Sequence, residues 1–146
     1  MGIFSKNTDQ IPELPRGLTT AYCLAGKHPE YEGPNKLRTG PDYLHGCLVI
    51  RRWAVSETDI ATARDLLMSP KTYGDRGLGA RCYFPGFAFT FGQNQSAIDA
   101  LVCLECRWVV FHLGEQSVAF APTDDGLARL RKIYETVIQK GQIEKT

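Results

Sequence analysis

The fold is decided by the stretch FAFTFGQNQSAIDALVCLECRWVVFHL, which runs from Phe87 to Leu113. Phenylalanine recurs at every second position at its start, and this alternation is typical of a half-buried strand. A short loop at 92–96 leads into a second apolar run, so antiparallel pairing is expected. An odd register places the phenylalanines on one face and leaves Thr90 opposite Asp99 on the other.

Four strands and two helices are expected along the chain. Alternation or β-rich composition predicts the strands, and capping residues precede two amphipathic segments. The strands are expected at 44–55, 80–91, 98–113 and 116–121, with helices after Ser56 and Thr123. The order β-α-β-β-β-α predicts an α+β fold, in which a four-stranded, mainly antiparallel sheet carries two helices on one face.

Each helix carries its own boundary signals. Ser56 is the expected N-cap of the first helix, because acidic residues that suit the helix dipole follow it. Ile60, Ala63 and Leu67 recur at the spacing of one buried face, and Pro70 marks the end. The apolar stripe expected after the Thr123 cap is Leu127, Leu130, Tyr134 and Val137.

Residues 1–43 differ in composition from the rest of the chain. Five of the eight prolines fall there, with glycines between them, and this density disfavours helices and continuous ladders. We expect a long extended arm, with one short strand at 18–24, that packs on the body through its scattered hydrophobic residues. The expected organisation is this arm, a single α+β domain at 44–140 and a tail at 141–146.

The run from Trp108 to Phe111 is apolar at every position and so loses the strand alternation. A strand that is apolar on both sides is usually covered on both faces. Two helices can cover only one face of the sheet. The other face therefore needs the N-terminal arm, a second subunit or a partner.

Composition excludes some classes of partner. The 146 residues include 17 Lys+Arg and 16 Asp+Glu, and this balance argues against nucleic acid as the main partner. No apolar run approaches the roughly 20 residues of a membrane-spanning helix. The first residues lack the apolar stretch of a signal peptide, so a cytoplasmic protein is expected.

The sequence CLEC at 103–106 is a CxxC motif, a spacing found in zinc sites and thiol redox proteins. Within a strand, residues three apart point to opposite faces, so no metal site is assigned. A bulge at Pro85-Gly86 would shift the register and place Cys82 opposite Cys106. That pair would form a disulfide in an oxidising compartment; without a signal peptide, we expect two reduced, buried thiols.

The sequence CYFP at 82–85, the phenylalanine-rich strand and CLEC at 103–106 together resemble a pattern in small uncharacterised bacterial α+β proteins. The pattern is C-[FY]-x-P followed by C-x-E-C, and it covers about residues 80–112. The resemblance implies a bacterial single domain with no assigned activity, whose cysteines belong to the scaffold. It supplies no catalytic residue.

The sequence KTYGDRGLGAR at 71–81 is the best candidate for a binding loop. Its glycines allow many conformations, its cations Lys71, Arg76 and Arg81 suit an anion, and Tyr73 offers a ring for stacking. It leads into a strand and not into a helix, so it is not a phosphate loop. A plain solvent-exposed connection explains the same residues.

Nucleophilic catalysis has little support in the sequence. The histidines are His28, His45 and His112, and no serine nucleophile motif accompanies them. His112, which follows Phe111 on a predicted strand, is expected to be structural or edge-exposed rather than a catalytic base.

These features favour a non-enzymatic protein-binding module of the bacterial inhibitor or immunity type, which needs no cofactor and binds another protein or itself. Aromatic residues and arginine dominate interface hot spots. The candidate binding residues are Tyr43, Trp53, Lys71, Tyr73, Arg76 and Arg81. One alternative is a thiol redox enzyme or sensor that uses Cys82, Cys103 and Cys106. A second is a small-ligand-binding protein whose pocket the phenylalanines line.

Overall fold

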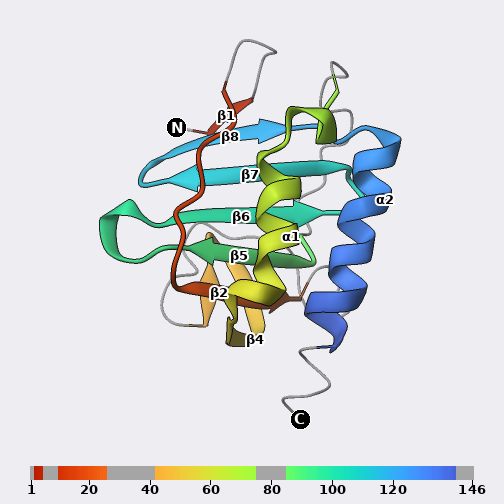
Figure 1. Cartoon of the computed structure of the whole chain (residues 1–146). Coiled ribbons are helices and arrows are strands. Elements are labelled where there is room, and N and C mark those ends of the chain that lie inside the picture. The colour runs from red at the N-terminus through yellow and green to blue at the C-terminus, as the bar shows by residue number, and fades with distance from the viewer. Residues whose placement is uncertain (1, 5–9, 26–41, 75–84, 141–146) are drawn as a thin grey trace.

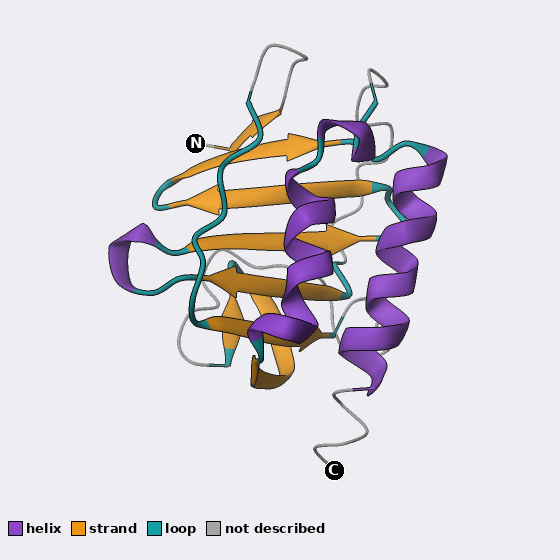
Figure 2. Cartoon of the chain, viewed as in Figure 1, coloured by secondary structure: helices purple, strands orange, loops and turns teal. Residues whose placement is uncertain are grey.

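The computed structural model describes residues 2–4, 10–25, 42–74 and 85–140 of the chain. Its strands form one curled sheet, and two helices lie side by side against one face of it (Figure 1). Figure 2 shows the two layers, one of helix and one of strand. The chain is therefore α+β with a mainly antiparallel sheet, as the sequence predicts.

Within the described residues, the sheet contains eight strands in the order β1-β8-β7-β6-β5-β2-β4-β3, so the predicted number of four is wrong. Neighbouring strands are antiparallel except for β1 and β8, which are parallel. The strands are β1 (Gly2–Phe4), β2 (Thr19–Leu24), β3 (Tyr43–Leu44), β4 (Cys47–Val55), β5 (Phe87–Phe91), β6 (Ile98–Cys103), β7 (Trp108–Leu113) and β8 (Gln116–Phe120).

The centre of the sheet is the meander β5-β6-β7-β8. Phe89 lies opposite Ala100, and Thr90 lies opposite Asp99, so the predicted register is confirmed. The loop that sets this register contains a short 3-10 helix, η2 (Asn94–Ser96). Because the register is odd, the phenylalanine side chains share one face and the Thr90–Asp99 pair lies on the other.

The predicted single strand at 98–113 is two strands, β6 and β7, joined by a turn at 104–107. Arg107 closes the turn with a left-handed backbone (φ 62°), and its N–H donates to the Cys103 carbonyl over 3.0 Å. The turn contains neither glycine nor proline, and Leu104 continues the apolar run into it. The usual turn signals are therefore missing from the sequence.

The predicted strand at 18–24 is confirmed as β2, but its place in the sheet was not foreseen. It lies between β5 and β4 and pairs with both, so the N-terminal segment supplies an interior strand of the sheet. Ala21 of β2 is fully buried. Before it, Leu14 is buried in the core under the helices, and its N–H donates to Met68 Sδ over 3.3 Å.

Helix α1 (Glu57–Met68) has the boundaries that the sequence predicts. The Ser56 side chain accepts a hydrogen bond from the Asp59 N–H over 3.1 Å, which is the expected N-cap. The helix ends at Ser69, before the 3-10 helix η1 (Pro70–Thr72). Its buried residues are Ile60, Ala63, Arg64 and Leu67.

Helix α2 (Asp124–Ile133) starts at the predicted cap, Thr123, and continues into a π-helical segment, η3 (Tyr134–Gln139). Its buried positions are Gly126, Leu130, Ile133 and Ile138, whereas the predicted stripe was Leu127, Leu130, Tyr134 and Val137. A π turn spaces hydrogen-bonded residues five apart, so it shifts the buried face beyond the 3.6-residue period. The predicted stripe is therefore only partly right.

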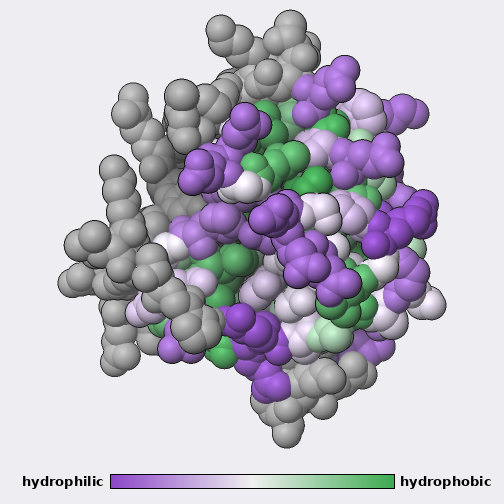
Figure 3. Space-filling model, turned by 90° about the vertical axis from the view of Figure 1, so that its left-hand side faces the viewer, coloured by the Kyte–Doolittle hydropathy of each residue, from purple (hydrophilic) through white to green (hydrophobic). Residues whose placement is uncertain are grey.

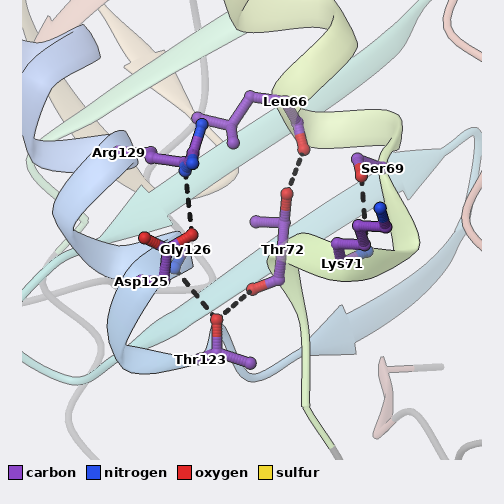
Figure 4. Close-up of polar contacts among 8 residues, drawn as sticks. All are labelled: Leu66, Ser69, Lys71, Thr72, Thr123, Asp125, Gly126 and Arg129. Carbon is purple, nitrogen blue, oxygen red and sulfur yellow. Dashed lines mark hydrogen bonds and ion pairs between the residues drawn. The ribbon is translucent and has the colours of Figure 1, made fainter.

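A compact polar joint connects η1 to the start of α2 (Figure 4). The Thr72 hydroxyl donates to the Leu66 carbonyl over 2.5 Å, and the Thr72 carbonyl accepts from the Thr123 N–H over 2.9 Å. Thr123 Oγ1 in turn accepts from the Gly126 N–H over 2.9 Å. A Cβ atom at Gly126 would lie 2.1 Å from the Thr72 carbonyl oxygen, so this position requires glycine.

Each face of the sheet has its own hydrophobic cluster. The helix-side cluster contains the three β5 phenylalanines with Val109 and Phe111, all fully buried beneath α1 and α2. The second-face cluster is Tyr22, Leu24, Cys47, Ala88, Leu101, Cys103, Cys106 and Trp108, with Leu44, Val49 and Val110 packed against it. Both faces are therefore covered, as the apolar β7 predicts. Part of the second cover is the β3–β4 hairpin, which the sequence did not suggest.

The described surface carries little exposed apolar area in large side chains. Among the described residues, the exposed large hydrophobics are Leu18 at 54% and Ile50 at 47%. In the view of Figure 3, hydrophilic residues lie between the hydrophobic areas and separate them. No helix within the described ranges is both long and apolar enough to span a membrane.

Candidate functional site

The candidate binding residues from the sequence do not gather on one surface. Tyr43 lies on β3 and Trp53 on β4, at one edge of the sheet. Lys71 and Tyr73 lie at η1, beside the end of β8 and so toward the opposite edge (Figure 1). The remaining candidates, Arg76, Arg81 and the thiol candidate Cys82, lie outside the described residues.

Tyr73 helps to hold the helices against the sheet. Its hydroxyl donates to the Leu67 carbonyl over 2.7 Å, and its ring centroid lies 5.2 Å from that of Phe120. Burial raises the pKa of the Tyr73 phenol above its ordinary value. A side chain held in this way has little surface left for a partner. The phenylalanines of β5 are likewise packed core, with no exposed area.

The cysteines lie mainly in the scaffold. Cys23, Cys47 and Cys103 are buried thiols. Cys106 is disulfide-bonded, which differs from the expectation of a reduced thiol at this position. Since Cys82 lies outside the described residues, the predicted pairing of Cys82 with Cys106 stays a prediction.

The CxxC motif spans the end of β6 and the turn that follows. The Cys106 N–H donates to Cys103 Sγ over 3.3 Å, so the turn holds the two residues close together. The expectation that they point to opposite faces of one strand is therefore wrong. No group of three or more His, Cys, Asp or Glu residues in the described part of the chain is arranged to hold a metal ion.

A polar cluster that the sequence did not reveal lies on the second face of the sheet. We call it the His–Asp cluster: Tyr22, His45, Thr90, Asp99 and His112. Three of its members lie in one row across adjacent strands, because Thr90 pairs with Asp99 and Asp99 pairs with His112. Tyr22 joins from β2, and His45 from the turn of the β3–β4 hairpin.

The directions of the hydrogen bonds in the cluster follow from which oxygen atoms carry a proton. Thr90 Oγ1 lies 2.6 Å from Asp99 Oδ1 and 2.9 Å from the Tyr22 hydroxyl oxygen. An ionised carboxylate can only accept, so the single Thr90 proton goes to Asp99 and the Tyr22 hydroxyl donates to Thr90. On its other oxygen, Asp99 Oδ2 lies 2.7 Å from His45 Nε2. Asp99 is thus anchored from two elements.

The two imidazoles of the cluster stack on each other. The ring centroids of His45 and His112 lie 3.6 Å apart, and the rings are inclined by 11°. The His45 and Asp99 side chains are 28% and 20% exposed, so solvent reaches one side of the cluster. The buried His112 Nε2 atom has no hydrogen-bond partner among the described residues.

The pKa values of two groups in the cluster, His112 and Asp99, are shifted. Burial and the neighbouring His45 lower the pKa of His112 to about 4, although Asp99 opposes the shift. The pKa of Asp99 is lowered as well: burial works against the shift, but the hydrogen bonds from His45 and Thr90 outweigh it. At neutral pH, His112 is therefore a neutral imidazole next to an ionised carboxylate.

Sequence reasoning found only part of this cluster. The register of β5 and β6 predicted the Thr90–Asp99 pair on the second face. His112 was assigned to the same strand as Asp99, so its place in the next strand was missed. His45 lies 54 positions from Asp99, and no local pattern signals that contact.

A second surface of interest is the edge formed by β4. β2 pairs with one side of β4 as far as Val55, whereas β3 pairs on the other side only with Cys47 and Leu48. Within the described part of the chain, no strand lies beside the outer edge of 50–55. This segment carries two consecutive arginines, Arg51 and Arg52.

Comparisons of the chain with protein-family models, with curated proteins and with solved structures found no match. The resemblance to small bacterial α+β proteins therefore stays a prediction.

Proposed function

We propose that the chain is a non-enzymatic protein-binding module that binds an extended segment of another protein along the outer edge of β4. The observation that carries the proposal is the length of this edge, which is six residues at 50–55 without a neighbouring strand in the described structure. An edge strand presents unpaired backbone N–H and C=O groups, and these can template the addition of another strand.

The side chains of the edge favour an acidic partner. Arg51 pairs with Cys23, a member of the helix-side cluster, and Arg52 pairs with Tyr22 on the second face. A strand added beside β4 therefore meets one guanidinium group on each face. Opposite charges on neighbouring strands stabilise pairing by roughly 0.2–1 kcal/mol per pair. Ile50, 47% exposed, adds an apolar contact at the same edge.

Two of the predicted anchors lie near this surface and are compatible with the proposal. Trp53 of β4 packs against the helix-side cluster, and Tyr43 lies on the adjacent β3. Lys71 and Tyr73 are too far along the sheet to contribute. An inhibitor or immunity function fits such a module, because both depend on binding another protein. The thiol enzyme or sensor stays a prediction.

Designed peptides of alternating sequence test the proposal directly. We expect a fluorescently labelled decapeptide that alternates valine with glutamate to bind, and its counterpart with lysine to bind at least about tenfold more weakly. Fluorescence anisotropy measures both affinities. Ile50→Glu should weaken the binding of the acidic peptide by about tenfold or more, because it places a like charge at the edge.

Leu18→Glu is the matched control, because Leu18 is the other exposed large hydrophobic residue among those described and lies before β2 rather than on β4. It should leave the affinity unchanged. Equal binding of the two peptides, or equal loss in the two variants, would rule out strand addition at β4.

A further inference from the structure

We infer that His45 and His112 form a proton-operated latch, which holds the β3–β4 hairpin on the second face of the sheet at neutral pH and releases it as the pH falls toward 5. This inference goes beyond the proposed function and does not depend on it. It stands on the geometry of the hairpin, of the stacked rings and of the groups that surround them.

The hairpin is built to place one histidine over the sheet. Leu44 pairs with Cys47, so its turn consists of two residues, His45 and Gly46. Both have a left-handed backbone, with φ of 49° and 82°, which is the conformation that tight hairpins use. Such a turn has little freedom, so the position of the His45 ring reports the position of the whole hairpin.

Closing the hairpin buries apolar surface. Cys47, two residues after His45, is 1% exposed, and Leu44 and Val49 pack against the second-face cluster. Beneath them lie side chains of the sheet such as Leu101 and Trp108. Release of the hairpin tip, residues 43–48, would therefore expose Cys47, whereas 49–55 of β4 stay paired with β2 and the helix-side cluster is not disturbed.

The strands and the turn around the two imidazole rings each place charged or polar side chains near them. The charged or titratable neighbours of His112 are His45 from the turn and Asp99 from β6. β8 places Ser117 opposite His112, and β5 supplies Thr90. β2 supplies Tyr22, over whose ring the Arg52 guanidinium of β4 lies at 5.6 Å. Asp99 thus offers the one negative charge of the cluster, and His45 already uses one of its oxygens.

The direction of the pH dependence follows from linkage. In the closed state, the pKa of His112 is lowered from 6.5 to about 4, whereas a solvated imidazole in the open state keeps the ordinary value. The closed state therefore binds fewer protons, and acid favours the open state between these two values. Asp99 does not cause the change. Its pKa is lowered from 3.8 in the closed state, so the ionised carboxylate favours the closed state throughout the range from pH 7 to pH 5.

The expected size of the effect follows from the same two values. Between pH 7 and pH 5, the ratio of open to closed hairpin should rise about 20-fold, given a His112 pKa of 6.5 in the open state and about 4 in the closed state.

Thiol labelling of the intact chain with 4,4′-dithiodipyridine, followed by peptide mapping, measures this ratio. The labelling rate of Cys47, relative to the same thiol in the denatured chain at the same pH, should rise about 20-fold from pH 7 to pH 5. Cys23 is the internal control, because it is buried in the helix-side cluster; its relative rate should change less than about twofold. A joint rise of both rates would mean global acid unfolding and would overturn the latch.

Two variants locate the sensor. His112→Phe keeps an aromatic ring for the stack and cannot bind a proton, so the pH effect on Cys47 should fall below about twofold. His28→Asn, which removes the third histidine of the chain, should keep the wild-type effect. Should His112→Phe fail to fold, the imidazole C–H chemical shifts of the wild-type protein decide the question. A titration midpoint of His112 near pH 6.5, instead of about pH 4, contradicts the proposal.

Discussion

At the scale of single residues, the buried guanidinium of Arg64 is the clearest feature that costs free energy of folding. Its side chain is 1% exposed, and its Nη2 donates to the two carboxylate oxygens of Glu57 over 2.6 and 2.9 Å. The Arg64 Nε atom has no hydrogen-bond partner among the described residues. Burying a charge is costly, and removing the partner of a buried charge costs more than removing the charge itself.

We therefore predict that Glu57→Gln lowers the melting temperature more than Arg64→Met does. The first variant leaves a buried cation without its counter-ion, whereas the second removes the cation and keeps a side chain of similar length. The double variant should have a melting temperature close to that of Arg64→Met, because glutamine at position 57 leaves no buried charge unpaired once the arginine is absent. Differential scanning calorimetry at neutral pH measures all three.

Glu57 also lies in the first turn of α1, where a carboxylate favours the helix dipole. Asp59→Asn is the control for this effect, because Asp59 is an exposed acid in the same turn. A fall in melting temperature for Asp59→Asn as large as that for Glu57→Gln would assign the loss to the dipole and contradict the role of the ion pair.

Residue-scale prediction from the sequence succeeded where one loop fixed the geometry. Thr90 and Asp99 flank a short connection, so alternation alone placed them opposite each other. The contact of His45 with Asp99 depends on how a distant hairpin folds over the sheet. No property of the two residues indicates that arrangement.

At the scale of elements, the most constrained contact is the approach of α2 to η1. A Cβ atom on Gly126 would lie 2.1 Å from the Thr72 carbonyl oxygen, which is itself the acceptor for the Thr123 N–H (Figure 4). Alanine is the better helix former by roughly 1 kcal/mol. At this position the steric conflict must outweigh that gain, because backbone cannot move as a flexible side chain does.

We predict that Gly126→Ala destabilises the protein by about 1–3 kcal/mol, in spite of its higher helix propensity. Denaturant unfolding with two-state analysis measures the free energy. Gly86→Ala is the matched control, since a Cβ there meets nothing within 4 Å and the backbone is not left-handed. It should change stability by no more than about 0.5 kcal/mol. A neutral or stabilised Gly126→Ala would show that α2 can shift away from η1.

Elements were predictable where local chemistry marks their ends. Ser56 and Thr123 cap the two helices as expected, since an N-cap depends only on neighbouring residues. The turn between β6 and β7 lacks such marks. The π turn after Ile133 changes the buried face of the last helix in a way that a fixed period cannot represent. The errors in the single strand predicted at 98–113 and in the predicted stripe of the last helix have the same cause. In both, a regular sequence pattern was continued through a point where the backbone is irregular.

At the scale of the whole molecule, the sequence gives no indication that β2 is interior to the sheet. The strand itself was expected, but its flanks are rich in proline and glycine, and these suggested a peripheral arm. Its pairing with β4 and β5 joins segments that lie far apart in the chain. Pairings between distant segments depend on how much apolar surface the whole fold buries. A short stretch of sequence does not contain that information.

The position of β2 leads to a prediction about truncation. Deleting residues 1–9 removes β1, an edge strand that pairs with β8. Deleting residues 1–25 also removes β2, which links β4 to the rest of the sheet. With it go the core side chains of Leu14, Tyr22 and Leu24, each worth about 1.5–3 kcal/mol of burial. Their sum is comparable with the roughly 5–15 kcal/mol that holds a typical domain together.

We therefore expect the shorter deletion to keep a cooperative thermal transition at a lower temperature, and the longer deletion to lose it together with the near-ultraviolet circular dichroism signal. Loss of β2 would leave β4 and β5 without a partner on the sides that face β2, and unpaired strands of this kind associate between molecules. Size-exclusion chromatography should accordingly show aggregation only for the longer deletion. A monomeric, cooperatively melting protein that lacks residues 1–25 would contradict the interior role of β2.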